Sequence, residues 1–220
     1  MGHKIELYQS LEKEFSKRGY LLYLVGGTVR DYLLNKELTD MDLVTDATPS
    51  EMKEFLIGDY TFERFGSVKA KKESTKFDIT TLRKESGYLD NRHPNKIIFT
   101  KDIKEDVCRR DITINALYMD KDLKVIDLVN GVNDLKDKVI KMIGDPQKRI
   151  EEDPLRIIRI YRFQIETGFN IDSSLKKVLE ENFDKVSLLN KDKIRQEIGK
   201  CSEKDKLVEI LNSHHIIIDK

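Results

Sequence analysis

Acidic residues at strand-like spacing carry the clearest chemical signal in the sequence. Asp40 and Asp42 are two positions apart and alternate with the apolar residues Met41 and Leu43. Because residues i and i+2 of a β-strand point to the same face, both carboxylates are expected to project together. Asp78 repeats this pattern on a later segment. Adjacent carboxylates without a basic partner are costly unless they bind a divalent cation, so the pattern predicts a phosphoryl-transfer centre with Asp40, Asp42 and Asp78 as catalytic residues. For Asp78, an ordinary solvent-facing strand position is the alternative.

A glycine pair precedes these acids. Gly26 and Gly27 lie between an apolar run and a short helical pattern. At such a place the backbone can approach a phosphate closely, and a helix N-terminus favours an anion. Arg30 lies one helical turn further on, within reach of the same phosphates. The pair predicts a nucleotide-binding turn, and a simple turn between strand and helix is the alternative. The segment is neither a P-loop nor a Gly-x-Gly-x-x-Gly motif.

Short strands and helices are expected to position these residues. An N-terminal helix is indicated by apolar residues at helical spacing from Ile5 to Phe15, and Gly19 marks its end. Helices are also predicted over 28–34 and 50–57, and a polar loop over 83–96. The segments predicted as strands are 21–25, 41–45, 61–65, 68–72, 76–82 and 97–100, with an edge element at 125–128.

The pattern changes at about Asp145. From there to the end it is helical, whereas the preceding part mixes strands and helices. The sequence therefore predicts an α+β fold, in which a small mixed β-sheet with flanking helices over residues 1–144 is followed by an all-helical domain over residues 145–220.

These segments together resemble a known family. Leu24–Leu34 followed by Asp40–Asp42 is similar to the signature of class II tRNA nucleotidyltransferases and bacterial poly(A) polymerases. Further segments that match in the family's order are Arg109–Leu117, Glu152–Phe163 and, more loosely, Asp192–Glu197. The resemblance runs from about residue 20 to about residue 200. It implies a nucleotidyltransferase head domain and a helical neck domain that work without an RNA or protein template. Full-length members continue into body and tail domains, which this sequence is expected to lack.

The resemblance also implies an activity. The chain is expected to add C and A from CTP and ATP to the 3′ end of tRNA, with two Mg²⁺ ions held by Asp40 and Asp42. The glycine pair, Arg30 and Arg110 are expected to contact ribose and phosphates. For Arg110, a basic pair with Arg109 that suits the end of a helix is the alternative. A poly(A) polymerase of the same superfamily and a truncated nucleotide-binding module without turnover are the alternatives for the whole chain.

Four residues of the predicted neck step by three positions and would form a slanting ridge on a helix: Asp153, Arg156, Arg159 and Arg162. The simplest role for Asp153 and Arg156 is a salt bridge. The resemblance implies that this pair selects the base. A carboxylate accepts from the amino group of C or A while a guanidinium donates to the ring nitrogen, whereas U and G would leave these groups unpaired. Arg159 and Arg162 are expected to neutralise phosphate or to brace the pair.

The loop 83–96 resembles a flexible loop that family members use between C and A addition, with Gly87, Tyr88, Asp90, Arg92 and Pro94 carrying the likeness. One residue departs from the family pattern. His93 stands where arginine is more usual, which puts normal addition of the final A in question. His214 and His215 have no partners at ligand spacing.

Composition limits the partners. The 220 residues carry a formal net charge of zero, so any attraction to RNA must be local. The candidate patches are Lys69, Lys71 and Lys72, the pair Arg109 and Arg110, and the arginines of the predicted neck. For single lysines, a solvated surface is the alternative.

The cysteines and the hydropathy of the sequence indicate in which cellular compartment the protein is expected. Cys108 and Cys201 are far apart in the sequence and not at metal-ligand spacing, which indicates the reduced thiols of a cytoplasmic protein. No apolar run approaches the ~20 residues that cross a membrane. A protein partner is not indicated.

Overall fold

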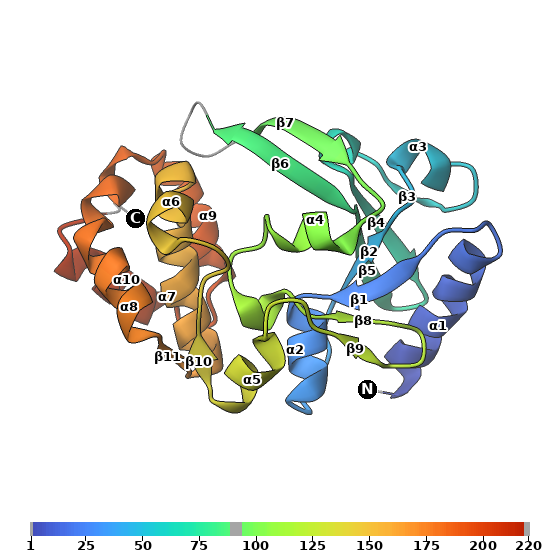
Figure 1. Cartoon of the computed structure of the whole chain (residues 1–220), viewed down its shortest axis with the longest axis horizontal. Coiled ribbons are helices and arrows are strands. Elements are labelled where there is room, and N and C mark those ends of the chain that lie inside the picture. The colour runs from blue at the N-terminus through green and yellow to red at the C-terminus, as the bar shows by residue number, and fades with distance from the viewer. Residues whose placement is uncertain (1, 89–93, 218–220) are drawn as a thin grey trace. The chain divides into compact units, whose positions relative to one another are not determined.

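The first part of the chain is built around a mixed β-sheet (Figure 1). The computed structural model describes residues 2–88 and 94–217. Within them the sheet has seven strands, of which β2 and β5 are parallel neighbours and the other neighbours are antiparallel. In spatial order they are β3 (Gly58–Asp59), β4 (Ser67–Lys72), β5 (Thr75–Thr81), β2 (Met41–Thr45), β1 (Leu22–Val25), β8 (Tyr118–Met119) and β9 (Val125–Ile126). The predicted α+β class and the edge element at 125–128 are confirmed.

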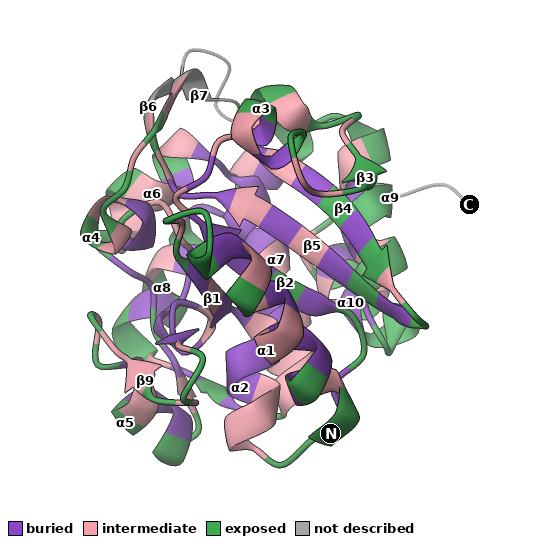
Figure 2. Cartoon of the chain, turned by 90° about the vertical axis from the view of Figure 1, so that its right-hand side faces the viewer, coloured by how far each residue is buried: buried purple, intermediate pink, exposed green. Residues whose placement is uncertain are grey.

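One face of the sheet is apolar, because buried and more exposed residues alternate along β4 and β5 (Figure 2). Its fully buried members include Met41, Phe77 and Ile79. Helix α1 (Gly2–Ser16) covers this apolar face, and the hydroxyl of its Tyr8 donates to the Leu22 carbonyl at 3.0 Å. Helix α2 (Gly27–Leu33) follows β1 directly and contacts β1 and β2. The opposite face is therefore left to the polar side chains of the strands.

Two predicted segments differ from the structure. The strand predicted over 61–65 is wrong: the 3-10 helix η1 (Glu63–Phe65) lies there, and it ends at Gly66, whose φ of 78° turns the chain into β4. The loop predicted over 83–96 is also wrong at its ends, because β6 (Arg83–Tyr88) and β7 (Pro94–Phe99) pair as a separate sheet. Glycine and proline at the inner ends of these strands suggested a loop. The predictions for Asp90, Arg92 and His93 lie outside the described residues.

The helix predicted over 50–57 is shorter in the structure. Helix α3 (Pro49–Met52) begins one residue before the predicted start, with a reciprocal capping box between Thr48 and Glu51. No glycine or proline stands at its end, so the sequence marks where this helix starts but not where it stops.

Between β7 and β8 lie the short helix α4 (Ile103–Val107) and the 3-10 helix η2 (Thr113–Asn115).

The chain forms two compact units. The first comprises the chain up to Ser86, Lys96–Arg110 and Ile114–Val132. Of the described residues, the second comprises Gly87, Tyr88, Pro94, Asn95, Asp111–Thr113 and the chain from Asn133 onward. Helix α5 (Gly131–Lys136) lies where the chain passes from the first to the second. Residues 133–144 therefore belong to the second compact unit, whereas the sequence analysis placed them in the head domain. The division into head and neck domains at residue 144 stays a prediction.

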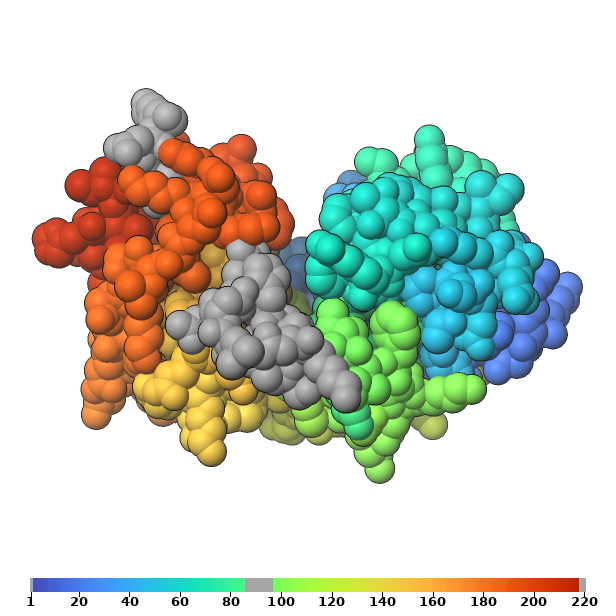
Figure 3. All heavy atoms as spheres, turned by 90° about the horizontal axis from the view of Figure 1, so that it is seen from above, coloured from blue at the N-terminus to red at the C-terminus, as the bar shows by residue number. Residues whose placement is uncertain are grey.

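The second unit is mostly helical. In the space-filling view, its C-terminal residues, coloured orange and red, lie next to one another (Figure 3). Its longest helix, α7, buries Ile157, Ile158 and Ile160 completely. The expectation of helix alone after Asp145 is wrong at β11 (Asn170–Ile171), which pairs in parallel with β10 (Val139–Ile140). The helices of this unit are α6 (Pro146–Glu152), α7 (Leu155–Thr167), α8 (Ser173–Glu181), η3 (Phe183–Leu188), α9 (Lys191–Lys200) and α10 (Lys204–Ser213).

Across the described residues, every helix is too short or too polar to cross a lipid bilayer. Location in the cytoplasm stays a prediction.

Candidate active site

The turn between β1 and α2 requires its first glycine. Gly26 has φ 67° and ψ −131°, a conformation that is essentially restricted to glycine. Its N–H donates to the Leu117 carbonyl at 3.2 Å. A methyl group added here would lie 3.8 Å from Oδ2 of Asp42 and 3.9 Å from a terminal nitrogen of Arg110. The glycine pair therefore lies directly beside a carboxylate and a guanidinium group.

Asp42 and Asp78 are paired across the parallel strands β2 and β5. Paired residues of neighbouring strands project from the same face, so the two carboxylates lie side by side. The Asp42 N–H donates to Oγ1 of Thr28 at 2.8 Å, which ties the start of β2 to α2. This arrangement agrees with the sequence prediction for these two acids.

The Asp42 side chain is exposed to solvent in a pocket, yet its carboxyl has a raised pKa. Surrounding protein raises its pKa to about 6, mainly by removing water and next through the charge of Asp78. Arg110 and Arg30 act in the opposite direction, and Asp40 adds a smaller increase. A pair of carboxylates in this state has the oxygen donors that a hard divalent cation prefers, and such a cation would relieve the repulsion.

Asp40 lies outside the pocket, although its charge still acts on Asp42. It is exposed, it precedes the first residue of β2, and it does not line the pocket. In the part of the chain that the structure describes, no three His, Cys, Asp or Glu side chains are grouped closely enough to hold a metal ion. Two of the three predicted carboxylates thus line the pocket, and the role of Asp40 at the metal stays a prediction.

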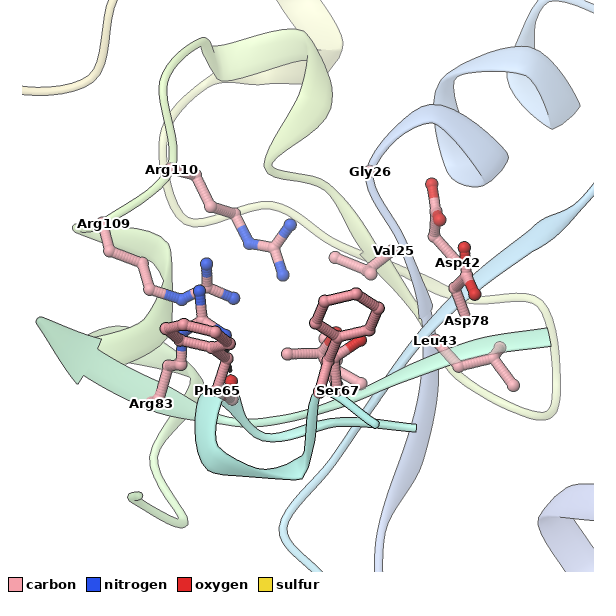
Figure 4. A pocket seen from close by; sticks show the side chains of 13 residues that line it. Val25, Gly26, Asp42, Leu43, Phe65, Ser67, Asp78, Arg83, Arg109 and Arg110 are labelled. Carbon is pink, nitrogen blue, oxygen red and sulfur yellow. Dashed lines mark hydrogen bonds between the residues drawn. The ribbon is translucent and has the colours of Figure 1, made fainter. Parts of the chain in front are cut away.

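The pocket beside the carboxylates has a volume of about 410 Å³. Arg83, Arg109 and Arg110, here called the arginine wall, lie on one side, and Asp42 and Asp78 lie on the other (Figure 4). The rest of the lining is Val25, Gly26, Leu43, Val44, Phe62, Phe65, Ser67 and Thr80. This separation of charge suits a polyanion that approaches a cation at the carboxylates.

A buried acid that the sequence analysis missed holds the arginine wall. Asp106 is fully buried, and its Oδ1 accepts from Nε of Arg109 at 2.8 Å and from the backbone N–H of Arg83 at 3.2 Å. Its Oδ2 accepts from Nε of Arg110 at 3.0 Å and from the Tyr118 hydroxyl at 2.8 Å. Burial alone would raise the pKa of Asp106, but Arg109 and Arg110 outweigh it and lower this pKa to about 2.

The spacing contained a usable signal for this acid. Asp106 precedes Arg109 and Arg110 by three and four positions, the separations at which side chains meet on a helical turn. Both guanidinium groups pair with a specific carboxylate, so the basic pair has a structural role beyond suiting the end of a helix, and its contact with phosphate stays a prediction.

Arg30 lies next to Gly27 of the glycine turn and does not line the pocket. It is 8% exposed and pairs with both carboxylate oxygens of Asp31, at 2.9 and 3.0 Å. A third nitrogen donates to Oδ1 of Asn115 at 2.7 Å. In this structure Arg30 acts on the site through its charge, which lowers the pKa of Asp42.

The second unit holds the other predicted residues, and their placement differs from the expectation. Asp153 does not lie on a helix with Arg156: it ends α6, and its Oδ1 accepts from the Leu155 N–H at 3.1 Å before α7 begins. Arg156 donates from Nε to Asp111 at 2.9 Å. The ridge that the spacing predicted starts at Arg156, because Pro154 separates Asp153 from α7.

Asp111 is a second buried acid that the sequence analysis missed, although it lies in a segment that carries the family resemblance. It pairs with Arg156 and, at 2.7 Å, with Arg159. Burial raises the pKa of its carboxyl, but Arg159 and Arg156 outweigh this effect and hold it below the usual value. Arg162 pairs separately, with Glu166 at 2.9 Å and Glu197 at 3.2 Å.

The Asp153 carboxyl lies within the field of the arginines of α7. Burial raises its pKa, and the charges of Arg156 and Arg159 oppose that rise. Asp153 and Arg156 are 8% and 3% exposed. Their role in selecting a base stays a prediction.

Comparison with known proteins gives consistent matches. Residues 22–141 match the family model described as the poly A polymerase head domain. The chain is 40% identical over 183 residues to the CCA-adding enzyme of Lactobacillus helveticus (strain DPC 4571), which covers 83% of the chain and 46% of that enzyme. The chain spans about half the length of the curated relatives it matches.

Solved structures match the fold. The Bacillus stearothermophilus CCA-adding enzyme in complex with CTP has a TM-score of 0.82 at 25% identity, covering 92% of this chain and 50% of that one. A tRNA nucleotidyltransferase complexed with a primer tRNA and an incoming ATP analog has a TM-score of 0.75 at 28% identity, covering 95% of this chain and 60% of that one.

The arginine wall depends on the charge of Asp106, which yields a stability prediction. Asp106→Asn leaves Arg109 and Arg110 without their buried counter-charge and is expected to lower the free energy of unfolding by about 3–5 kcal/mol. Tyr118→Phe removes one neutral hydroxyl, which donates to Asp106 and accepts from Arg110, and is expected to cost about 2 kcal/mol. Urea unfolding of both variants measures the difference. Equal losses would contradict the dominant role of the carboxylate charge.

Proposed function

Since the chain belongs to the poly A polymerase head domain family, we propose that it is a nucleotidyltransferase that extends RNA 3′ ends. The finer proposal is CCA addition, in which C and A from CTP and ATP are joined to the 3′ end of tRNA. The similarity to CCA-adding enzymes supports this choice, as do the structures of relatives with CTP or with a primer tRNA.

The observation that carries the proposal is the pocket in which Asp42 and Asp78 face the arginine wall. Nucleotidyl transfer joins two polyanions at a phosphorus atom, and catalysis depends on positioning and on stabilising negative charge. Guanidinium groups match phosphate oxygens in geometry and charge. The arginine wall would therefore bind the triphosphate, and the glycine turn would let its oxygens approach the backbone.

Asp40 and Asp42 would hold Mg²⁺, as the sequence predicts, and Asp78 beside Asp42 would add a third carboxylate to the site. A bound Mg²⁺ lowers the pKa of the attacking hydroxyl and neutralises charge on the triphosphate. In the reaction, the 3′-oxygen of the RNA forms a bond to the α-phosphorus and pyrophosphate leaves. The protein orients both reactants: Arg110 holds phosphate, and the N–H of Asp42, bonded to Thr28, keeps β2 in register with the turn.

Asp153 and Arg156 would read the incoming base, with Arg159 and Arg162 as supports. The ion pair of Arg156 with Asp111 bears on this part of the proposal. It restrains the guanidinium, so that less side-chain freedom is lost when a base binds. Discrimination against U and G would then come from the polar groups of Asp153 and Arg156 that these bases leave without a hydrogen-bond partner.

Nucleotide incorporation tests the function directly. With Mg²⁺, the chain is expected to add C and then A to tRNA that lacks its 3′ end, and to refuse U and G. Labelled products from each of the four nucleoside triphosphates, on tRNA and on an unstructured RNA, provide the measurement. Addition of A alone to any RNA would identify a poly(A) polymerase. Binding of CTP and ATP without incorporation would identify a nucleotide-binding module.

Asp42→Asn separates catalysis from stability. The raised pKa means that the folded chain takes up a proton more readily than the unfolded chain, so the charged Asp42 destabilises the fold above about pH 6 and the penalty fades as the pH falls toward 4. At pH 7 without divalent ions, the variant is expected to show no detectable transfer and a Tm equal to or slightly above that of wild type, because solvent at the exposed Asp42 screens part of the repulsion.

Thermal unfolding across pH 5–8, with and without Mg²⁺, checks this expectation. Mg²⁺ should stabilise wild type and leave the variant unchanged. A variant that transfers nucleotides at the wild-type rate would disprove the assignment of Asp42.

Asp153→Ala is expected to impair base choice more than turnover, because in this proposal the carboxylate contacts the incoming base and none of the reacting atoms. The rate of U incorporation relative to C should rise by about ten-fold or more, the effect of removing one discriminating interaction of roughly 1–3 kcal/mol. Single-turnover rates with each triphosphate measure it. Unchanged selectivity would refute the role in base choice.

A further inference from the structure

Lysines continue the polar face of the sheet beyond the carboxylates. In the β-sheet register Lys69 lies opposite Asp78, which lies beside Asp42, so these three residues form one row across β4, β5 and β2. In the next row Lys71 and Lys76 lie directly opposite each other. Lys69, Lys71 and Lys76 are all exposed.

The pair of Lys71 and Lys76 is unfavourable for the sheet itself. Like charges directly opposite on antiparallel strands repel each other and destabilise the pairing. Within the described part of the chain, no acidic side chain forms an ion pair with either lysine. Asp40, two positions before Asp42 just as Lys76 is two positions before Asp78, is the acid next to this row, and it forms no ion pair with Lys76. In the described residues, therefore, no ion pair accounts for the two positive charges at this place.

The neighbouring lysines differ from this pair. Lys72, which the sequence analysis grouped with Lys69 and Lys71, points to the apolar face, where its Nζ lies 3.0 Å from both Ser10 and Glu14 of α1. Lys69 lies opposite Asp59 of β3, whose lowered pKa reflects first its hydrogen bond with Thr61 and also the charge of Lys69. The uncompensated charge of the patch is thus concentrated at Lys71 and Lys76.

The direction along the strands matters for the reaction. On β5, Asp78 and Thr80 line the pocket, whereas Lys76 lies on the other side of Asp78 and lines no part of it. The carboxylates therefore separate two positive regions, the arginine wall and the lysine pair. In an in-line displacement the attacking and leaving oxygens lie on opposite sides of the phosphorus. If the leaving pyrophosphate lies toward the arginine wall, the attacking strand approaches from the lysine side.

Building on the proposed function, we propose that Lys71 and Lys76 bind the phosphodiester backbone of the RNA strand whose 3′ end is extended. The match is one of charge: two ammonium groups without acidic partners face a strand that carries one negative charge per nucleotide. The interaction is with the backbone, so it is independent of the RNA sequence.

The double variant Lys71→Ala/Lys76→Ala tests the proposal, with Lys13→Ala/Lys17→Ala as the control. The control removes the same charge from exposed positions in and just after α1, which covers the apolar face. Binding of a fluorescently labelled single-stranded RNA to the 220-residue chain is measured by anisotropy over a range of salt concentrations. The control is expected to bind like wild type.

The test variant is expected to lose RNA affinity by about ten-fold at 0.1 M salt and to reduce the slope of log affinity against log salt by about 1.4, or roughly 0.7 for each phosphate that is no longer neutralised. Its Tm should equal or exceed that of wild type, because the repulsion is removed. Lys71→Arg/Lys76→Arg should restore affinity. In incorporation assays KM for RNA should rise while KM for the triphosphate stays the same.

The binding measurement separates this proposal from the proposed function, since it needs no turnover. Unchanged RNA affinity and salt slope in the test variant would overturn the role of the lysines even if the wild type incorporates nucleotides. An equal decrease in the control would also overturn it, because the effect would then be one of net charge. A decrease confined to the test variant would support the proposal even in a chain that incorporates nothing.

Discussion

The repulsion between Asp42 and Asp78 is the constraint on which the charged groups of the candidate site depend. The parallel pairing of β2 and β5 puts the two carboxylates side by side, and the surrounding protein raises the pKa of Asp42 to about 6. A protein without further use for this pair would gain stability by replacing one acid. The positive charges of Arg110 and Arg30 offset the cost in part, and a bound cation would offset more of it.

The arginines that surround this pair are themselves held by buried acids. Asp106 receives hydrogen bonds from Arg109, Arg110 and Tyr118, and in the second unit Asp111 pairs with Arg156 and Arg159. In both places burial alone would favour the neutral acid, and the guanidinium groups keep it ionised. Long flexible side chains are thereby restrained before a ligand arrives, which reduces the entropy lost on binding.

Local patterns predicted much of this arrangement. Alternation of acidic and apolar residues identified the face of Asp42 and Asp78, and the glycine pair marked the turn at the end of β1, because both features depend on strand geometry over a few residues. The identity of the arginines' partners was not predictable in this way. The hydrogen bond between Asp111 and Arg156 joins residues that are 45 positions apart, so no local period reports it. The predicted position of Asp153 on the same helix as Arg156 was wrong for another reason. Proline at position 154 separates Asp153 from the helix that carries the arginines.

The segment from Asp106 to Asp111 contributes to both units. Asp106 anchors the arginine wall of the first, and five residues later Asp111 belongs to the second. Neither unit is therefore one continuous stretch of chain. A chimera that joins two relatives at residue 144 would combine Asp111 from one parent with the arginines of α7 from the other. Recombination between divergent homologues should be tolerated at that point only where both parents keep compatible partners, so the carboxylate and the two arginines are expected to be inherited as a set.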